Sequence, residues 1–253
     1  MKTFRILSLL LLSLTTPVMS QEAAAPQQVT PAAATDFSRS ALAEQLAACP
    51  ETQEGISRKI ELIIAELNEN AEAYHMENLP KLDSSLIPIR VSPKRSTNMG
   101  VTHWDANSSS ARFSLSIFTS TLPAARTDSE RHLREMHLVD TIVHELAHCY
   151  FHMRYNYIGK KDDGLGYTIS EGFAMHVART FLRRNFPHIT ATTRYDETFV
   201  SRNYASEYRQ FRSRFTDNKG CVNWEELDRI EVSFAPRGYT ITNRIQRRGS
   251  RNF

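Results

Sequence analysis

Cysteine, tryptophan and glycine are scarce in this chain of 253 residues, which contains 3, 2 and 9 of them. Beyond the first 20 residues, no apolar run approaches the roughly 20 residues that a membrane-spanning helix needs. No internal repeat and no cell-wall-binding repeat is visible. With 41% hydrophobic residues, the chain suits one globular domain with a core of ordinary size.

The chain also lacks an excess of charge of one sign. Its formal net charge is +3, and residues 1–20 contain two basic residues and no acid. Without them, 29 basic residues stand against 28 acidic ones, which leaves +1. This balance gives no electrostatic argument for nucleic acid or for acidic partners. Residues 244–253 are interpreted as a basic flexible tail.

The N-terminal residues are typical of an exported protein. Two basic residues precede an apolar stretch from Ile6 to Leu14, and small residues near Ser20 suit cleavage. We therefore expect a signal peptide over residues 1–20 and a periplasmic or secreted protein. Residues 21–35 are rich in Ala, Pro and Gln and predict a flexible leader. No cysteine follows the cleavage point, so nothing indicates a lipid anchor.

Export permits disulfides, and three cysteines are available. Cys149 follows His148 directly, so on a helix its side chain turns away by about 100°, toward packing. We interpret it as a buried free thiol. Cys49 and Cys221 then remain as the candidate pair, although a sequence cannot establish connectivity.

Periodicity predicts a single domain of the α+β class over residues 36–243, mostly helical. Apolar residues from Ile56 to Tyr74 recur at intervals of three and four and give the clearest helix. Met153–Ile169, with three glycines, is predicted as a mobile loop. The other expected helices cover residues 36–49, 127–152, 170–185, 204–215 and 223–230.

Alternating apolar residues between positions 87 and 118 predict a small antiparallel or mixed sheet. Pro88 cannot donate a ladder hydrogen bond, so the first strand must be short or at an edge. A second strand is expected over Met99–Asp105 and a third over Ala111–Phe118. The third strand is either an edge strand to which an extended substrate could add, or an interior strand, and both alternatives stay open.

The most informative motif is His144-Glu145-Leu146-Ala147-His148. Histidines four residues apart lie one helical turn from each other, so both imidazoles can reach one point. Two imidazole ligands with a carboxylate beside an open coordination position are the parts of a zinc-activated water and its general base.

The residues before this motif place it inside a long helix. Thr127 to Glu130 read Thr-Asp-Ser-Glu, a capping box that starts a helix. From Leu133 to Tyr150, apolar residues then recur at helical spacing and predict a buried stripe along one side. A metal site in the middle of such a helix would be held rigidly.

Downstream, residues 170–174 read Ser-Glu-Gly-Phe-Ala. The combination of H-E-L-A-H with S-E-G-F-A resembles the gluzincin metallopeptidases, in particular their aminopeptidase and peptidase MA-like patterns. The resemblance covers roughly residues 99–180. It implies a zincin-like domain and a Zn²⁺ ion held by His144, His148 and Glu171, with Glu145 as the base. A G-x-M-E-N-type segment for a free amino terminus is absent.

Other residues compete for roles at this site. His176 is the rival third ligand, but five residues after Glu171 its side chain points about 140° away. His152 is one turn beyond His148, and we expect it to lie behind the ligands or in solvent. Asp140 is a candidate partner for a ligand imidazole. The expected oxyanion stabiliser is one of four residues, with no choice among them: Tyr167, His188, Tyr204 and Tyr208.

The sequence therefore predicts zinc-dependent hydrolysis of peptide bonds in a protein or peptide substrate, with Glu145 as general base. Two alternatives remain. One is a zinc amidase that acts on cell-wall peptides with the same site. The other is a non-catalytic binding protein that keeps a metal for stability, against which the presence of Glu145 argues.

Overall fold

The structure is a computed structural model, and four segments of the chain are described here: residues 40–104, 113–155, 164–187 and 199–230. Backbone alone is described for Trp104 and for residues 199–203. The predicted signal peptide, leader and basic tail, together with His188, lie outside these segments.

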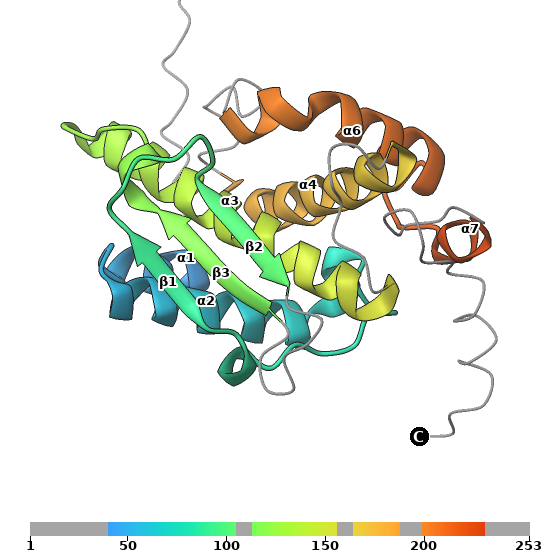
Figure 1. Cartoon of the computed structure of the whole chain (residues 1–253), viewed down its shortest axis with the longest axis horizontal. Helices are drawn as coiled ribbons and strands as arrows, with labels where there is room; N and C mark the ends of the chain where they lie inside the picture. The colour runs from blue at the N-terminus through green and yellow to red at the C-terminus, as the bar shows by residue number, and fades with distance from the viewer. Residues whose placement is uncertain (1–39, 105–112, 156–163, 188–198, 231–253) are drawn as a thin grey trace, which may run out of the picture. The chain divides into compact units, whose positions relative to one another are not determined.

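The fold is a mixture of helices and strands in which helices dominate, as predicted (Figure 1). Helix α2 (Gln53–Glu69) carries the predicted apolar stripe, and η1 (Ala71–Tyr74) follows it. The other α-helices within the described segments are α1 (Ala41–Ala48), α3 (Asp128–Tyr155), α4 (Leu165–Asn185), α6 (Phe199–Phe215) and α7 (Trp224–Arg229). Short 3-10 turns η2 (Ser84–Leu86) and η3 (Thr119–Thr121) flank the strands.

The three strands form one mixed sheet in the order β1-β3-β2 (Figure 1). Strand β1 (Ile89–Ser92) runs parallel to β3 (Phe113–Phe118), and β2 (Gly100–Trp104) runs antiparallel to it. In β3, the alternate residues Phe113, Leu115 and Ile117 are buried, as their spacing predicts.

The order of the strands decides between the two alternatives for the third strand. Strand β3 lies between its two neighbours, so an edge position for Ala111–Phe118 is wrong. Among the described strands, β2 is the edge that lies against α3. The prediction for Pro88 is confirmed, because β1 is a short edge strand. Pro88 contributes its carbonyl oxygen, which accepts a hydrogen bond from the Leu115 amide.

Helix α3 begins as its sequence predicts. The Glu130 amide donates to the Thr127 hydroxyl, and the Glu130 carboxylate accepts from the Thr127 amide at 2.8 Å, which completes the capping box. The expectation of one buried side is wrong, however. Every residue from Met136 to His152 is buried, because β2 and β3, α2 and α4 all contact this helix.

The predicted loop is shorter than expected. Helix α3 extends to Tyr155 and α4 already begins at Leu165, so both ends of the predicted loop Met153–Ile169 are helical. Glu171 thus sits in the second turn of α4. The helix ends at Asn185, two residues before Pro187, as expected.

Gly172 has a packing reason to follow Glu171. A Cβ atom built on it would lie 2.3 Å from the Phe211 Cβ and 2.7 Å from the Glu207 carbonyl oxygen of α6. Any larger residue would therefore push α6 away from α4, since real Cβ contacts are never so short. The glycine allows these two helices to pack closely.

All three cysteines are free thiols, so the predicted pairing of Cys49 with Cys221 is wrong. Cys149 is fully buried, as expected, and burial raises the pKa of its thiol. Among the described residues, no helix combines the length and the apolar character needed to cross a membrane.

The capping box gives the first testable prediction. Replacing Thr127 with alanine leaves the Glu130 amide without its acceptor and should lower the free energy of unfolding by about 1 kcal/mol. Ser129→Ala, which changes an exposed residue outside the pair of reciprocal bonds, is the control and should be near neutral. Urea titration followed by circular dichroism measures both; equal effects would contradict the assignment.

Candidate metal centre

Two neighbouring helices bring three potential metal ligands together. His144 and His148 lie one turn apart on α3, and Glu171 comes from α4, which packs along α3 (Figure 1). All three side chains are buried, with Glu171 only 7% exposed. Within the described residues, these three form a group whose donor atoms could hold a metal ion.

The distances between donor atoms fit a single small ion. The Nε2 atoms of His144 and His148 are 3.2 Å apart, and Oε2 of Glu171 lies 3.1 Å from the first and 3.5 Å from the second. Ligands about 2.0–2.1 Å from a tetrahedral Zn²⁺ are about 3.3–3.4 Å from each other. The triangle therefore has the size that such an ion requires, and two nitrogens with one carboxylate oxygen suit zinc chemistry.

Electrostatics at the three residues are tightly linked. Burial raises the pKa of Glu171, but the imidazoles of His148 and His144 outweigh it, so the pKa lies well below its usual range. Burial lowers the pKa of His144, but the hydrogen bond and charge of Glu171 outweigh this and raise it overall. A metal ion needs neutral imidazoles, so an ion bound here would compete with protons and would bind more tightly as pH rises.

The residues around the ligands hold them unequally. The Nδ1 atom of His148 lies 3.0 Å from the Ser170 hydroxyl, a bond that fixes the orientation of the ring. The Nδ1 atom of His144 is buried without a hydrogen-bond partner among the described residues. We expected Asp140 to bond to a ligand imidazole, but it does not bond to this Nδ1 atom. Asp140 is buried, and its charge helps to raise the pKa of His144.

Glu145 is held by the edge strand of the sheet. The Thr102 hydroxyl of β2 lies 2.7 Å from Oε2 of Glu145 and 2.9 Å from its backbone carbonyl oxygen, so its single proton is shared between these two acceptors. Gly100 makes the close approach possible, since a Cβ there would meet the Glu145 Cγ at 2.8 Å and the Thr141 Cγ2 at 2.6 Å. The carboxylate is thus oriented by β2, and its charge acts on His144.

Two tyrosines extend the site toward α6. The Tyr204 ring stacks on the His144 ring, with 5.3 Å between centroids and 25° between planes. Tyr204 is the one residue in α6 with non-helical backbone angles, and this kink separates it from the regular helix that follows. Burial and the charge of Glu171 raise the pKa of Tyr204. The same two causes raise the pKa of Tyr167, whose side chain forms a hydrogen bond with that of Tyr204, to about 12.

These contacts narrow the candidates for the oxyanion stabiliser. Tyr204 and Tyr167 lie at the site and keep their phenol protons at neutral pH, whereas Tyr208 stacks on His176 instead. His188 lies outside the described residues.

His176 and His152 are not part of the ligand group. His176 faces His75, Tyr208 and Phe211, with its centroid 5.3 Å from that of His75. His176 and Glu171 therefore face different neighbours, as expected for residues five apart on a helix. His152 is 3% exposed, so it does not face solvent, and its ring packs edge-on against Phe113.

Sequence reasoning missed four residues near the site: Gly100, Thr102, Ser170 and Glu207. Ser170 precedes a proposed ligand and could have been noticed. The others come from segments that only tertiary packing brings here. Glu207 of α6 places a buried carboxylate oxygen close enough to raise the pKa values of Tyr167 and Tyr204.

No family model, no curated protein and no solved structure matches this chain.

The ligand group makes a prediction about metal content. We expect the purified chain to bind one equivalent of Zn²⁺, and His144→Ala, His148→Ala and Glu171→Ala each to lose most of it, because two donors hold zinc poorly. His176→Ala, an equally buried residue of α4, should keep the metal. Elemental analysis after dialysis measures this, and loss of metal in the His176 variant alone would contradict the assignment.

Proposed function

We propose that the chain is a zinc-dependent hydrolase of peptide bonds, exported from the cytoplasm, with His144, His148 and Glu171 as ligands. The observation that carries the proposal is the position of Glu145. Its carboxylate lies beside the two histidine ligands and is held by a hydrogen bond from Thr102. A purely structural metal site needs four ligands and no such base. A catalytic site needs three ligands, an open position and a proton acceptor.

The residues present can support the steps of such a reaction. Zn²⁺ bound here would lower the pKa of a water molecule and polarise the carbonyl of the substrate. Glu145 accepts the proton of the attacking water and later delivers it to the leaving amine. Thr102 keeps the carboxylate in one orientation, and the stacked Tyr204 with Tyr167 provides phenol protons for the developing oxyanion.

The sheet supports a peptide as substrate. Strand β2 is an edge of the described sheet and carries Thr102, which contacts Glu145. An extended peptide that pairs with an edge strand places its backbone beside the residues of that strand. Pairing with β2 would therefore bring a peptide carbonyl toward Glu145, so β2 takes the role for which Ala111–Phe118 was one candidate.

Glu145→Gln tests the base directly. The amide has the same shape but cannot accept the proton, so we expect zinc content to stay unchanged and peptide hydrolysis to fall at least about 100-fold. Glu61→Gln, an exposed position on α2, is the matched control and should keep full activity. Turnover of an unstructured protein substrate such as casein, followed by mass spectrometry, gives the readout.

Each result of this experiment has a clear consequence. Undiminished hydrolysis by the Glu145→Gln variant would refute Glu145 as base. A wild-type chain that binds zinc but cleaves neither proteins nor cell-wall peptides would instead support a metal-stabilised binding protein. Cleavage of cell-wall peptides alone would assign the same chemistry to an amidase.

Thr102→Val tests the orientation of Glu145. Valine keeps the shape but removes the donated hydrogen bond, so kcat should fall roughly tenfold with KM little changed. Thr168→Val is the control and should leave both constants unchanged, because the Thr168 hydroxyl donates to the Gly164 carbonyl at the start of α4 and not to Glu145. A rise in KM without a change in kcat would show that Thr102 contacts the substrate and does not act through Glu145.

A further inference from the structure

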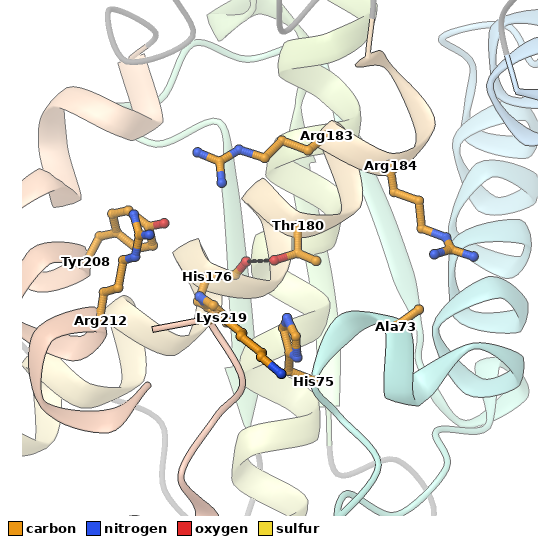
Figure 2. A pocket seen from close by; sticks show the side chains of 10 residues that line it. Ala73, His75, His176, Thr180, Arg183, Arg184, Tyr208, Arg212 and Lys219 are labelled. Carbon is orange, nitrogen blue, oxygen red and sulfur yellow. Dashed lines mark hydrogen bonds between the residues drawn. The ribbon is translucent and has the colours of Figure 1, made fainter. Parts of the chain in front are cut away.

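A cavity of about 390 Å³ lies on a part of α4 that the metal centre does not use (Figure 2). Its wall combines residues from α4, from α6, from the end of η1 and from the turn after α6. The residues that matter here are His75, His176, Arg183, Arg184, Arg212 and Lys219. We call this cavity the basic pocket.

The lining of the basic pocket carries charge of one sign. Four of the ten lining residues are arginine or lysine, and none is acidic. Among the described residues, no salt bridge involves any of these four cations. Asp217, in the same turn as Lys219, accepts backbone hydrogen bonds from Lys219 and Cys221 and does not line the cavity.

His176 forms a buried polar wall of the pocket. It is only 4% exposed, and both of its ring nitrogens are buried without a hydrogen-bond partner. The Gly220 backbone lies beside the ring and acts on it as a weak hydrogen-bond partner that raises the pKa of His176, but no hydrogen bond of normal geometry joins the two. Figure 2 shows the ring among the labelled side chains, with the His176 carbonyl accepting from Thr180 at 2.8 Å. Buried polar atoms of this kind normally have a partner.

The field inside the pocket is positive. Burial and then the charges of His75, Arg212 and Arg183 lower the pKa of His176 to about 3. The imidazole is therefore neutral at pH 7 and can donate one N–H. The same charges that disfavour a proton on His176 favour an anion beside it.

We propose that the basic pocket binds a phosphoryl group, carried by a small phosphate ester or by a lipid headgroup. Arginine guanidinium groups recognise phosphate oxygens through paired hydrogen bonds, and lysine adds a compact charge. The neutral His176 supplies a donor at the buried wall. At about 390 Å³ the cavity is within the range of small-molecule sites and leaves room for the organic part of an ester.

The surface arginines alone would not justify this proposal, because exposed cations are usually just solvated. Arg183, Arg184, Arg212 and Lys219 are indeed exposed. What distinguishes the basic pocket is that they surround a cavity whose buried wall presents unpaired nitrogen atoms. Solvated cations on a protein surface are not normally arranged around buried nitrogen atoms that lack hydrogen-bond partners.

The proposal does not depend on the metal centre. His176 follows Glu171 by five residues and therefore points about 140° away from it on α4. None of the ligands, nor Glu145, lines the basic pocket. The Glu145→Gln variant should therefore bind phosphate like the wild type, whatever it does to hydrolysis.

Isothermal titration of the full chain tests the proposal with inorganic phosphate and pyrophosphate at constant ionic strength. We expect saturable binding, tighter for pyrophosphate because it carries more charge. Arg212→Gln should weaken pyrophosphate binding about tenfold, and a double variant with Lys219→Gln should weaken it further. Arg214→Gln, an exposed arginine of α6 outside the pocket, is the control and should bind like the wild type.

A second measurement reports on His176 itself. In ¹⁵N NMR spectra of the imidazoles, pyrophosphate should shift the His176 resonances, and His176→Asn should weaken binding with an unchanged circular dichroism spectrum. The proposal is overturned if neither probe saturates, if Arg214→Gln weakens binding as much as Arg212→Gln, or if an acidic peptide binds and phosphate does not.

Two further arms identify the source of the phosphoryl group. Glycerol phosphate is the small ester, and vesicles with phosphatidic acid in phosphatidylcholine present the headgroup. A small ester is the source if glycerol phosphate binds and vesicles do not. A lipid is the source if vesicles bind the wild type, are displaced by pyrophosphate, and lose affinity in Arg212→Gln. Binding of neither ester would overturn the proposed ligand class.

Discussion

The burial of polar side chains on α3 is the constraint on which the rest of this fold depends. From Met136 to His152 the helix has no exposed residue, although it carries histidines, an aspartate and a glutamate. Such groups are costly to bury without partners. At the candidate site the surrounding elements supply them: Thr102 from β2 for Glu145, Glu171 from α4 for His144, and Ser170 for His148. A metal ion would satisfy the donor atoms that these contacts leave facing one another.

Helix α4 is shared by the two sites because its faces have different neighbours. Glu171 faces α3, Gly172 allows α6 to approach closely, and His176 faces the basic pocket. Helix α6 is divided in the same way. Tyr204, at the kink, stacks on His144, whereas Tyr208 one turn later stacks on His176. The spacing of residues along these two helices therefore keeps the candidate metal centre and the basic pocket separate.

Local chemistry explains which parts of the structure could be predicted from the sequence. The Thr127 capping box, the stripe of α2 and the proline stop of α4 depend on neighbours within a few residues, and the structure has them as expected. The central position of β3, the burial of α3 on all sides and the free state of Cys49 depend on contacts between distant segments. The periodicity of apolar residues describes one helix or strand at a time, so it could not predict contacts between distant segments.

At the candidate site, too, local spacing predicts some residues, whereas others depend on the packing of distant segments. The spacing of His144 and His148 placed two donors on one face of a helix, and this needed no tertiary information. Glu171 was chosen over His176 mainly through a motif resemblance, and the packing of α3 on α4 is what brings its carboxylate to the two imidazoles. Thr102 was beyond reach, because nothing near it in the chain marks a hydroxyl that will hold Glu145. A helix-spaced motif can thus name the ligands that lie on its own helix, whereas the residues that orient them come from whichever elements cover that helix.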